Sequence, residues 1–437
     1  MIRFWFVVFS LVIISKVHAQ DKISVEQVIL TSLQRNYDIQ LRENDAIPAH
    51  YEDRHSYGIL LPRLNGQGAT VNNNNNNRTI TASNVETVRT GVRSDNINGS
   101  LQLAWTLFDG TKMFATRKRL DETAELAELT IKDQINNTVA QVINTYFGIV
   151  REKQQLKAIG EQIGVSEERV KLAEKKLQVG TGGKPEYLQA KIDLNAFRTA
   201  ALQQESLILQ LKEQLNLLLG MSLPVQYDIS DSIPIQLDLQ VSDFEQSFEK
   251  TNRTLLAAKK SMDIASATLW ETKAMQSPVF NFTSNYNFSK TENNLATSAV
   301  SLLYSRVKGF NYGFSLSIPI FNGFNTRTII QRAQTGVQRQ QLIYDQQKSI
   351  AQVGIRNAFI SYENARQTLT IEEENIILVK ENVFIALEGF KRGITTFIEL
   401  RTAQQSLQEA YNRLIAVRYR AKVAETELLR LQGVLVQ

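Results

Sequence analysis

The segment over 400–431 carries apolar residues at alternating steps of three and four for ten consecutive positions, and charged or amide residues fill much of the remainder. Such a pattern is typical of a helix that packs along a narrow seam against other helices. The same pattern occurs 213 residues earlier, broken once by Gln204. The chain therefore contains two copies of one helical unit. The two seams are Leu400, Ala403, Leu407, Ala410, Leu414, Val417, Ala421, Ala424, Leu428, Leu431 and Tyr187, Ala190, Leu194, Phe197, Ala201, Gln204, Ile208, Leu211, Leu215, Leu218.

Composition permits a folded core and excludes several kinds of site. With 437 residues, 43% of them hydrophobic, the chain is long enough to bury a core. It has no cysteine, which excludes disulfides, thiolate metal sites and a lipidated N-terminal cysteine. The net charge is only +5, and lysine and arginine are interspersed with acids, which argues against binding to nucleic acid.

The first nineteen residues have the pattern of a secretory signal peptide. Arg3 supplies a basic start, an apolar run covers 4–14, and Val17-His18-Ala19 is a small-residue exit site, so cleavage is expected after Ala19. The alternative, a membrane anchor, is weaker because the run is too short to span a bilayer comfortably. No later stretch approaches the roughly 18 apolar residues of a spanning helix, so we expect any membrane crossing to be made by strands.

The duplication divides the rest of the chain. We predict a first repeat over 20–220, an equatorial connector over 221–240 and a second repeat over 241–437. Each repeat is expected to begin with a helix, at 22–60 and 242–274, and then to form two strands, a long helix and a return helix. The strands are predicted at about 64–71, 97–108, 279–288 and 311–321, the long helices at about 111–179 and 326–391, and the return helices at 186–219 and 397–431.

Two polar segments are predicted to be loops. The six asparagines from Asn72 to Asn77 form a low-complexity run, and such a run is typical of a surface loop. A second polar loop is expected over 289–308. The strands beside them alternate apolar and polar residues, as in a transmembrane β-barrel. Trp105, Tyr304, Tyr312 and the phenylalanines of the strands are candidates for aromatic girdles at the membrane boundary, with packing inside a sheet as the alternative.

The number of strands constrains the assembly. Four strands are too few to close a barrel, and open sheet edges in lipid would leave backbone groups unpaired. The chain is therefore expected to share a barrel with identical copies, and three chains would supply twelve strands and twelve helical positions. We predict a mainly α-helical chain with a transmembrane β-barrel contribution, in which the helices form a hollow tube. The alternative for the strands is a soluble sandwich.

The repeated plan resembles that of the TolC-like outer membrane factor family. The resemblance covers nearly all of the mature chain and rests on the order of its motifs: Phe108-Asp109-Gly110 and Phe321-Asn322-Gly323 after the second strands, and the turns over 180–186 and 393–399. It implies a homotrimeric channel-tunnel with a 12-stranded β-barrel in outer-membrane lipid and a 12-helix α-barrel in the periplasm. It also implies partners, namely a periplasmic adaptor (membrane fusion protein) and an inner-membrane RND or ABC pump, and export of drugs, metals or proteins.

The same resemblance assigns residues at the periplasmic entrance. The first of two acidic positions that line this entrance in the family falls on Glu399, and the second falls on Thr402, so we expect one ring of three carboxylates, which would favour cations. The alternative is that Glu399 only caps its helix, because Thr396 lies three residues before it. Family members can also lock the entrance through an arginine, a tyrosine and an acid; the corresponding residues here are Thr395, Phe390 and Glu186, and Lys391, Arg392 or Lys184 are possible substitutes for the arginine.

The exposed turn residues are the expected adaptor contacts, with bare helix–helix turns as the alternative. They are Gly180, Thr181, Gly182, Gly183, Lys184 and Pro185 in the first turn, and Gly393, Ile394, Thr395 and Thr396 in the second.

Catalysis and cofactors are not expected. Gly182-Gly183-Lys184 is not a phosphate loop, because Pro185 stands where serine or threonine is needed. The mature chain has two histidines, His50 and His55, whose spacing does not place them on one helix face, so a metal site is improbable. We therefore predict a passive export duct. The alternatives are the outer-membrane component of a type I protein secretion system and, from a different class, a periplasmic coiled-coil scaffold.

Overall fold

The computed structural model describes residues 22–221, 227–236, 238–296 and 302–435; the predicted signal peptide over 1–19 lies outside these ranges. The chain divides into two compact units. Unit 1 consists of residues up to Asn44 together with Thr130–Leu256 and Lys348–Gln437, and unit 2 of Asp45–Leu129 and Ala257–Gln347. Unit 1 is helical apart from two short strands, and unit 2 contains a four-stranded sheet.

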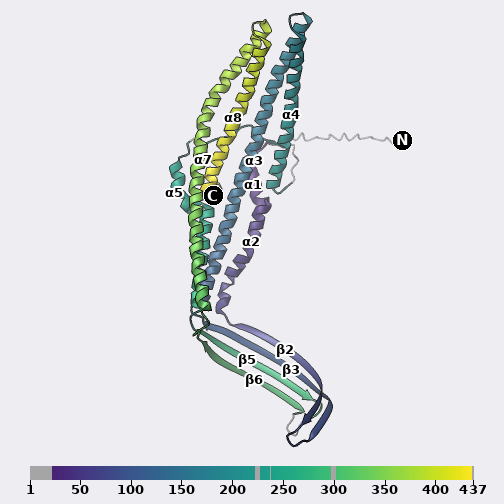
Figure 1. Cartoon of the computed structure of the whole chain (residues 1–437), viewed down its shortest axis with the longest axis vertical. Helices are drawn as coiled ribbons and strands as arrows, with labels where there is room; N and C mark the ends of the chain where they lie inside the picture. The colour runs from purple at the N-terminus through teal and green to yellow at the C-terminus, as the bar shows by residue number, and fades with distance from the viewer. Residues whose placement is uncertain (1–21, 222–226, 237, 297–301, 436–437) are drawn as a thin grey trace, which may run out of the picture. The chain divides into compact units, whose positions relative to one another are not determined.

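The element order repeats once along the chain (Figure 1). A two-residue strand β1 (Lys22–Ile23) pairs in parallel with β4 (Asp228–Ile229), and a short 3₁₀ helix η1 covers Ser56–Leu60. The first copy consists of α1 (Val25–Arg35), α2 (Tyr37–Arg54), β2 (Arg63–Ile80), β3 (Glu86–Phe108), α3 (Lys112–Gln178) and α4 (Lys184–Leu218). The second consists of α5 (Val241–Thr251), α6 (Arg253–Ala274), β5 (Val279–Asn293), β6 (Tyr304–Ser317), α7 (Asn325–Arg392) and α8 (Phe397–Gln432).

The first helix of each repeat is interrupted at a buried asparagine. Single helices over 22–60 and 242–274 were expected, but Asn36 and Asn252 adopt extended backbone conformations. The Asn36 amide donates to the Leu218 carbonyl at 2.8 Å, and its side-chain oxygen accepts from the Ile39 N–H. Asn252 makes the equivalent pair, donating to the Leu431 carbonyl at 2.7 Å and accepting from the Leu255 N–H. Each asparagine therefore caps one helix and satisfies a carbonyl at the end of a return helix, which explains why the pattern occurs twice.

The two seams differ in burial within one chain. Nine of the ten seam residues of α8 are buried, from Leu400 to Leu428. In α4 only four are buried, namely Ala190, Leu194, Ile208 and Leu215. Because a seam is stabilised by removing apolar surface from water, α4 has apolar surface left for another partner.

The sheet of unit 2 is antiparallel in the order β2-β3-β5-β6, so β2 and β6 lie at its edges (Figure 1). The register places Trp105 opposite Phe282, and Phe282 opposite Phe314, on one face. The rings of Phe282 and Phe314 lie 5.0 Å apart. On the other face, Thr106 donates to Asn281 at 2.9 Å. One face is thus apolar and aromatic, and the other is rich in asparagine, serine and threonine.

The strands correct three expectations. The polar loop expected over 289–308 is too long, because residues 289–293 belong to β5 and residues 304–308 to β6. The prediction of a loop over Asn72–Asn77 is wrong, because these residues belong to β2 and pair with β3, from Asn72 opposite Asp95 to Asn77 opposite Arg89. Backbone pairing with a neighbouring strand outweighs the low strand propensity of asparagine. The predicted strand over 311–321 also ends early, at Ser317, because Pro319 cannot donate to a ladder.

Among the described residues, no helix combines the length and the apolar composition needed to cross a bilayer.

Candidate functional site

The two helix–helix turns in unit 1 have a similar backbone design. Gly180 and Gly393 each adopt a left-handed conformation, with φ of +77° and +76°. In the first turn the Gly182 N–H donates to the Lys176 carbonyl at 3.0 Å, and in the second the Ile394 N–H donates to the Gly389 carbonyl at 2.9 Å. These bonds satisfy carbonyls at the ends of α3 and α7, so both turns are compact and defined by glycine.

Glu399 lies in the first turn of α8 and forms a capping box with Thr396. The Thr396 N–H donates to the Glu399 carboxylate at 2.7 Å, and the Thr396 hydroxyl accepts from the Glu399 N–H at 3.3 Å. The Thr396 hydroxyl also donates to the Glu399 carboxylate at 2.9 Å. The bond that the carboxylate accepts from the Thr396 backbone, and then the one from the hydroxyl, lower the pKa of Glu399. The side chain is nevertheless exposed in one chain, and Thr402, also exposed, adds no second acid. Capping and exposure of charge therefore occur together at Glu399.

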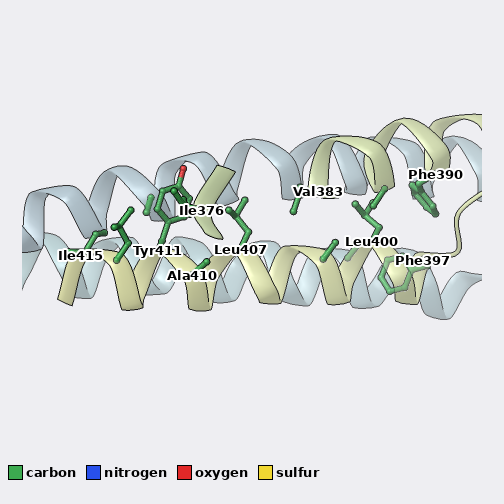
Figure 2. Close-up of a cluster of buried hydrophobic side chains, with 14 of the residues drawn as sticks. Ile376, Val383, Phe390, Phe397, Leu400, Leu407, Ala410, Tyr411 and Ile415 are labelled. Atoms are coloured by element: carbon green, nitrogen blue, oxygen red, sulfur yellow. The ribbon is translucent and has the colours of Figure 1, made fainter. Parts of the chain in front are cut away.

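Phe390 belongs to the hydrophobic core. It is 2% exposed, and its ring lies 6.4 Å from that of Phe397 on the other side of the turn (Figure 2). Lys176 from α3 reaches it: the ammonium lies 3.8 Å from the centre of the Phe390 ring and donates to the Phe390 carbonyl at 3.0 Å. The aromatic side chain at this position is thus part of the core, and a lysine links the ends of α3 and α7.

A second link lies further from the turns. The Arg169 side chain on α3 is 1% exposed and donates to Asp193 on α4 at 2.5 Å. Asp193 also pairs with Arg401 on α8 at 3.3 Å. Burial lowers the pKa of the Arg169 guanidinium, and the Asp193 carboxylate opposes that shift. We call Arg169, Asp193 and Arg401 the charge triad; it joins one helix pair from the first repeat to a helix from the second.

The contact between α3 and α8 contains buried polar side chains without hydrogen bonds. Tyr411 of α8 bonds to Glu161 of α3, and the Arg169 guanidinium lies over the Phe397 ring at 5.1 Å. In the same two helices, neither the donors nor the acceptors of the Gln162 and Gln404 side chains, both buried, have a partner among the described residues. Each such group costs about 1–3 kcal/mol. These unpaired groups reduce the stability that α3 and α8 gain from burial.

The three basic residues that could substitute for the arginine of the lock form no ion pair with Glu186 in the described part of the chain. Lys391 pairs with Glu388 at 2.8 Å, and Lys184 and Arg392 are exposed. Within the described part of one chain, Glu186 is half-exposed and has no salt bridge. The other turn residues, including Thr395 and Ile394, lie at the surface or partly exposed.

Sequence reasoning missed Lys176 and Arg169, although a signal exists. Gln162, Arg169 and Lys176 recur at a strict seven-residue spacing on α3. Polar residues at this spacing fit a solvated helix face, but they also fit a seam position that faces a neighbouring helix.

Within the described ranges, no group of three or more histidine, aspartate or glutamate side chains is arranged to hold a metal ion.

Comparison with known families gives the identity of this architecture. The model of the family described as "Outer membrane efflux protein" matches residues 31–221 and 246–434, which is most of both repeats. The chain belongs to the outer membrane efflux protein family. The resemblance to TolC-like proteins is therefore confirmed, and membership in the outer membrane efflux protein family supports an outer-membrane location and a role as an efflux duct. Its relatives include proteins described as outer membrane efflux proteins and outer membrane channels.

Individual relatives are distant. The chain is 22% identical over 354 residues to protein CyaE of Bordetella pertussis, covering 79% of this chain and 73% of CyaE. It is 20% identical over 363 residues to outer membrane protein TolC of Salmonella enteritidis, covering 82% of this chain and 72% of TolC.

Two solved structures of outer membrane proteins have the same fold. Outer membrane protein VceC of Vibrio cholerae has a TM-score of 0.78 at 17% identity, covering 94% of this chain and 96% of that chain. The CmeC outer membrane channel of Campylobacter jejuni has a TM-score of 0.78 at 16% identity, covering 94% and 85%. The mainly helical fold with a β-barrel contribution is thus confirmed.

Proposed function

We propose that three copies of this chain form an outer-membrane channel-tunnel that serves as the passive export duct of a tripartite efflux system. The observation that carries the proposal is the open four-stranded sheet, with one aromatic face, one polar face and two edges, β2 and β6, without partners in the described chain. In lipid such edges must be paired, and a ring of identical chains pairs β6 of one copy with β2 of the next.

The helices of unit 1 support assembly with further copies. On α7, Ile371, Leu378 and Ile385 recur every seven residues and are 64%, 65% and 59% exposed in one chain. On α4, Ile192, Leu202 and Leu209 are also exposed. Apolar side chains that recur every seven residues, as on α7, form a coiled-coil seam. In the trimer, α7 of one copy would pack against α4 of its neighbour, which gives a closed ring of helices.

The turn end is the proposed periplasmic entrance. In this assignment, the residues over 180–185 and 393–396 contact the periplasmic adaptor, and an inner-membrane pump supplies the energy. The unpaired polar groups of Gln162 and Gln404 support a movable contact between α3 and α8, because separating them exposes these groups to water, where they gain hydrogen bonds. Three Glu399 side chains would form an acidic ring at the mouth.

Planar-bilayer recording of the purified protein tests the duct. We expect a small closed-state conductance with a preference for cations. Glu399→Gln should reduce the cation-to-anion permeability ratio by about two- to threefold, because three charges near a narrow mouth set the local field. Glu409→Gln, which removes another exposed acid of α8, is the matched control and should leave the ratio unchanged. Equal ratios in wild type and Glu399→Gln would reject the acidic ring, and a protein without conductance would reject the duct.

The pH dependence of that preference follows from the capping box. Because the bonds from Thr396 lower the pKa of Glu399, the carboxylate keeps its charge as the pH falls through the ordinary titration range of glutamate, about pH 4.3. The cation preference should therefore be the same at pH 7 and pH 5 and disappear only in more acidic solution. Thr396→Val removes the hydroxyl bond and should shift this loss to higher pH.

A further inference from the structure

The apolar face of the sheet in unit 2 ends in cationic side chains near the tip of the β5–β6 hairpin. On β6, Arg306 and Lys308 continue the row of alternate positions that includes Phe310. On β5, Lys290 lies directly opposite Arg306, and Phe288 directly opposite Lys308. These cations therefore lie on the same face as the aromatic side chains. We call Lys290, Arg306 and Lys308 the basic rim.

The charge of the basic rim is only partly compensated. Lys290 pairs with Glu292 at 2.8 Å. Among the described residues, Arg306 and Lys308 have no carboxylate partner; both are exposed and lie over the Phe288 ring, at 5.6 and 6.0 Å from its centre. Like charges opposite one another destabilise a strand pair. Glu292 offsets part of the repulsion between Lys290 and Arg306, and a bound anion would reduce it further.

A groove on the same face lies beside the basic rim. The register forms one continuous row of Gly68, Gly99, Phe288 and Lys308 across four strands. The two glycines leave a hollow of about 370 Å³ that Leu101, Tyr286 and Phe288 border. A Cβ atom added at Gly68 would meet nothing within 4 Å. The hollow is open to the apolar side of the sheet and is suited to a hydrocarbon chain.

The position of the basic rim along the strand matches a membrane boundary. On β5 the apolar face runs from Phe280 to Phe288, which is about 27 Å along a strand at about 3.4 Å per residue. With the usual tilt of about 40°, this corresponds to about 20 Å along the barrel axis, close to the apolar band of about 25 Å in outer-membrane barrels. The next residues toward the hairpin tip are those of the basic rim, at the level of lipid headgroups.

We propose that the basic rim and the adjacent glycine groove form a binding site for a phosphate-bearing lipid of the outer leaflet. Arg306 and Lys308 bind a headgroup phosphate through charge-assisted hydrogen bonds, and an acyl chain lies in the groove beside Phe288. The proposal rests on the proposed function, in which these strands cross the outer membrane, and it takes the hairpin tips to lie on the outer side. A lipid held there would neutralise the opposed cations.

The test uses the purified full-length trimer in an uncharged detergent and fluorescently labelled, bisphosphorylated lipid A, with binding measured by anisotropy. Arg306→Gln combined with Lys308→Gln should weaken binding by about tenfold or more, since two charge-assisted bonds are lost. The matched control is Arg78→Gln, which removes an exposed arginine that already pairs with Glu86 at 2.6 Å and should bind lipid as the wild type does.

A groove variant and a competition experiment identify the ligand. Gly68→Leu fills the groove without changing the charge and should also weaken lipid binding, whereas inorganic phosphate at millimolar concentration should not displace the lipid. Unchanged affinity in the double glutamine variant would overturn the site, and displacement by inorganic phosphate would show an anion site without lipid specificity, which also overturns it.

Conductance in planar bilayers separates this proposal from the proposed function. The double variant and Gly68→Leu should conduct as the wild type does, because the basic rim is on the lipid face. A conducting wild type whose lipid affinity is insensitive to both variants contradicts the lipid site alone, whereas a wild type that does not conduct contradicts the duct.

Discussion

Asp193→Asn is expected to lower the free energy of unfolding by about 3 kcal/mol per chain. Asp193 neutralises Arg169, whose side chain is 1% exposed, and also pairs with Arg401. With asparagine in its place, the Arg169 guanidinium remains buried without a counter-charge. Removing one partner of a buried pair costs far more than the pair contributes, because the other charge stays desolvated.

Arg169→Met separates the penalty of an orphaned charge from the contribution of the triad. Methionine fills a similar volume without charge, so this variant should stay within about 1 kcal/mol of the wild type, and Arg169→Met combined with Asp193→Asn should recover most of the loss. Glu373→Gln is the surface control, since its pair with Arg418 is solvent-exposed and worth about 0–1 kcal/mol. Guanidinium titrations followed by far-UV circular dichroism report all four variants; an Asp193→Asn curve that overlays that of Glu373→Gln would show that the triad is not structural.

Local patterns in the sequence predicted the regular elements, but they did not predict contacts between distant parts of the chain. Periodicity predicted the helices and the alternating strands, because each signal is local and repeats along the chain. The segment Asn72–Asn77 was wrongly predicted to be a loop, because the composition of this segment does not show that it pairs with β3. In the same way, Asn36 was read as part of a continuous helix, although its function depends on the distant Leu218 carbonyl.

The residues of the candidate site show the same difference between local and long-range signals. Glycines that end the long helices, such as Gly180 and Gly393, could be placed from sequence because their conformation is a local requirement. The links from Lys176 and Arg169 could not, because a lysine or arginine on a long helix has the same local signature whether it faces water or another helix. Only the packing of α3 against helices of the second repeat distinguishes the two.

Tyr312→Pro is expected to abolish assembly of the trimer, with a yield of heat-resistant trimer at least about tenfold lower. The Asn293 N–H donates to the Leu303 carbonyl at 2.8 Å, and the register continues without a bulge, so odd-numbered residues of β6 bond to β5. The backbone groups of Tyr312 then point to the free edge, where β2 of the next copy would pair. Proline removes that donor, and its ring obstructs the neighbouring strand; an unpaired group in lipid costs several kcal/mol.

The position of the proline decides how this result is interpreted. Tyr304→Pro places the same residue at the first position of β6, where strands tolerate proline, so this variant should still give trimers that resist heating before electrophoresis. If both variants assemble, β6 is not an interface between copies; if neither does, proline acts on the hairpin itself, and Tyr312→Phe then confirms that the tyrosine side chain is dispensable. Loss at Tyr312 alone is the outcome expected when the free edge of one chain is completed by the next, because only the middle of the strand lies within the hydrocarbon layer.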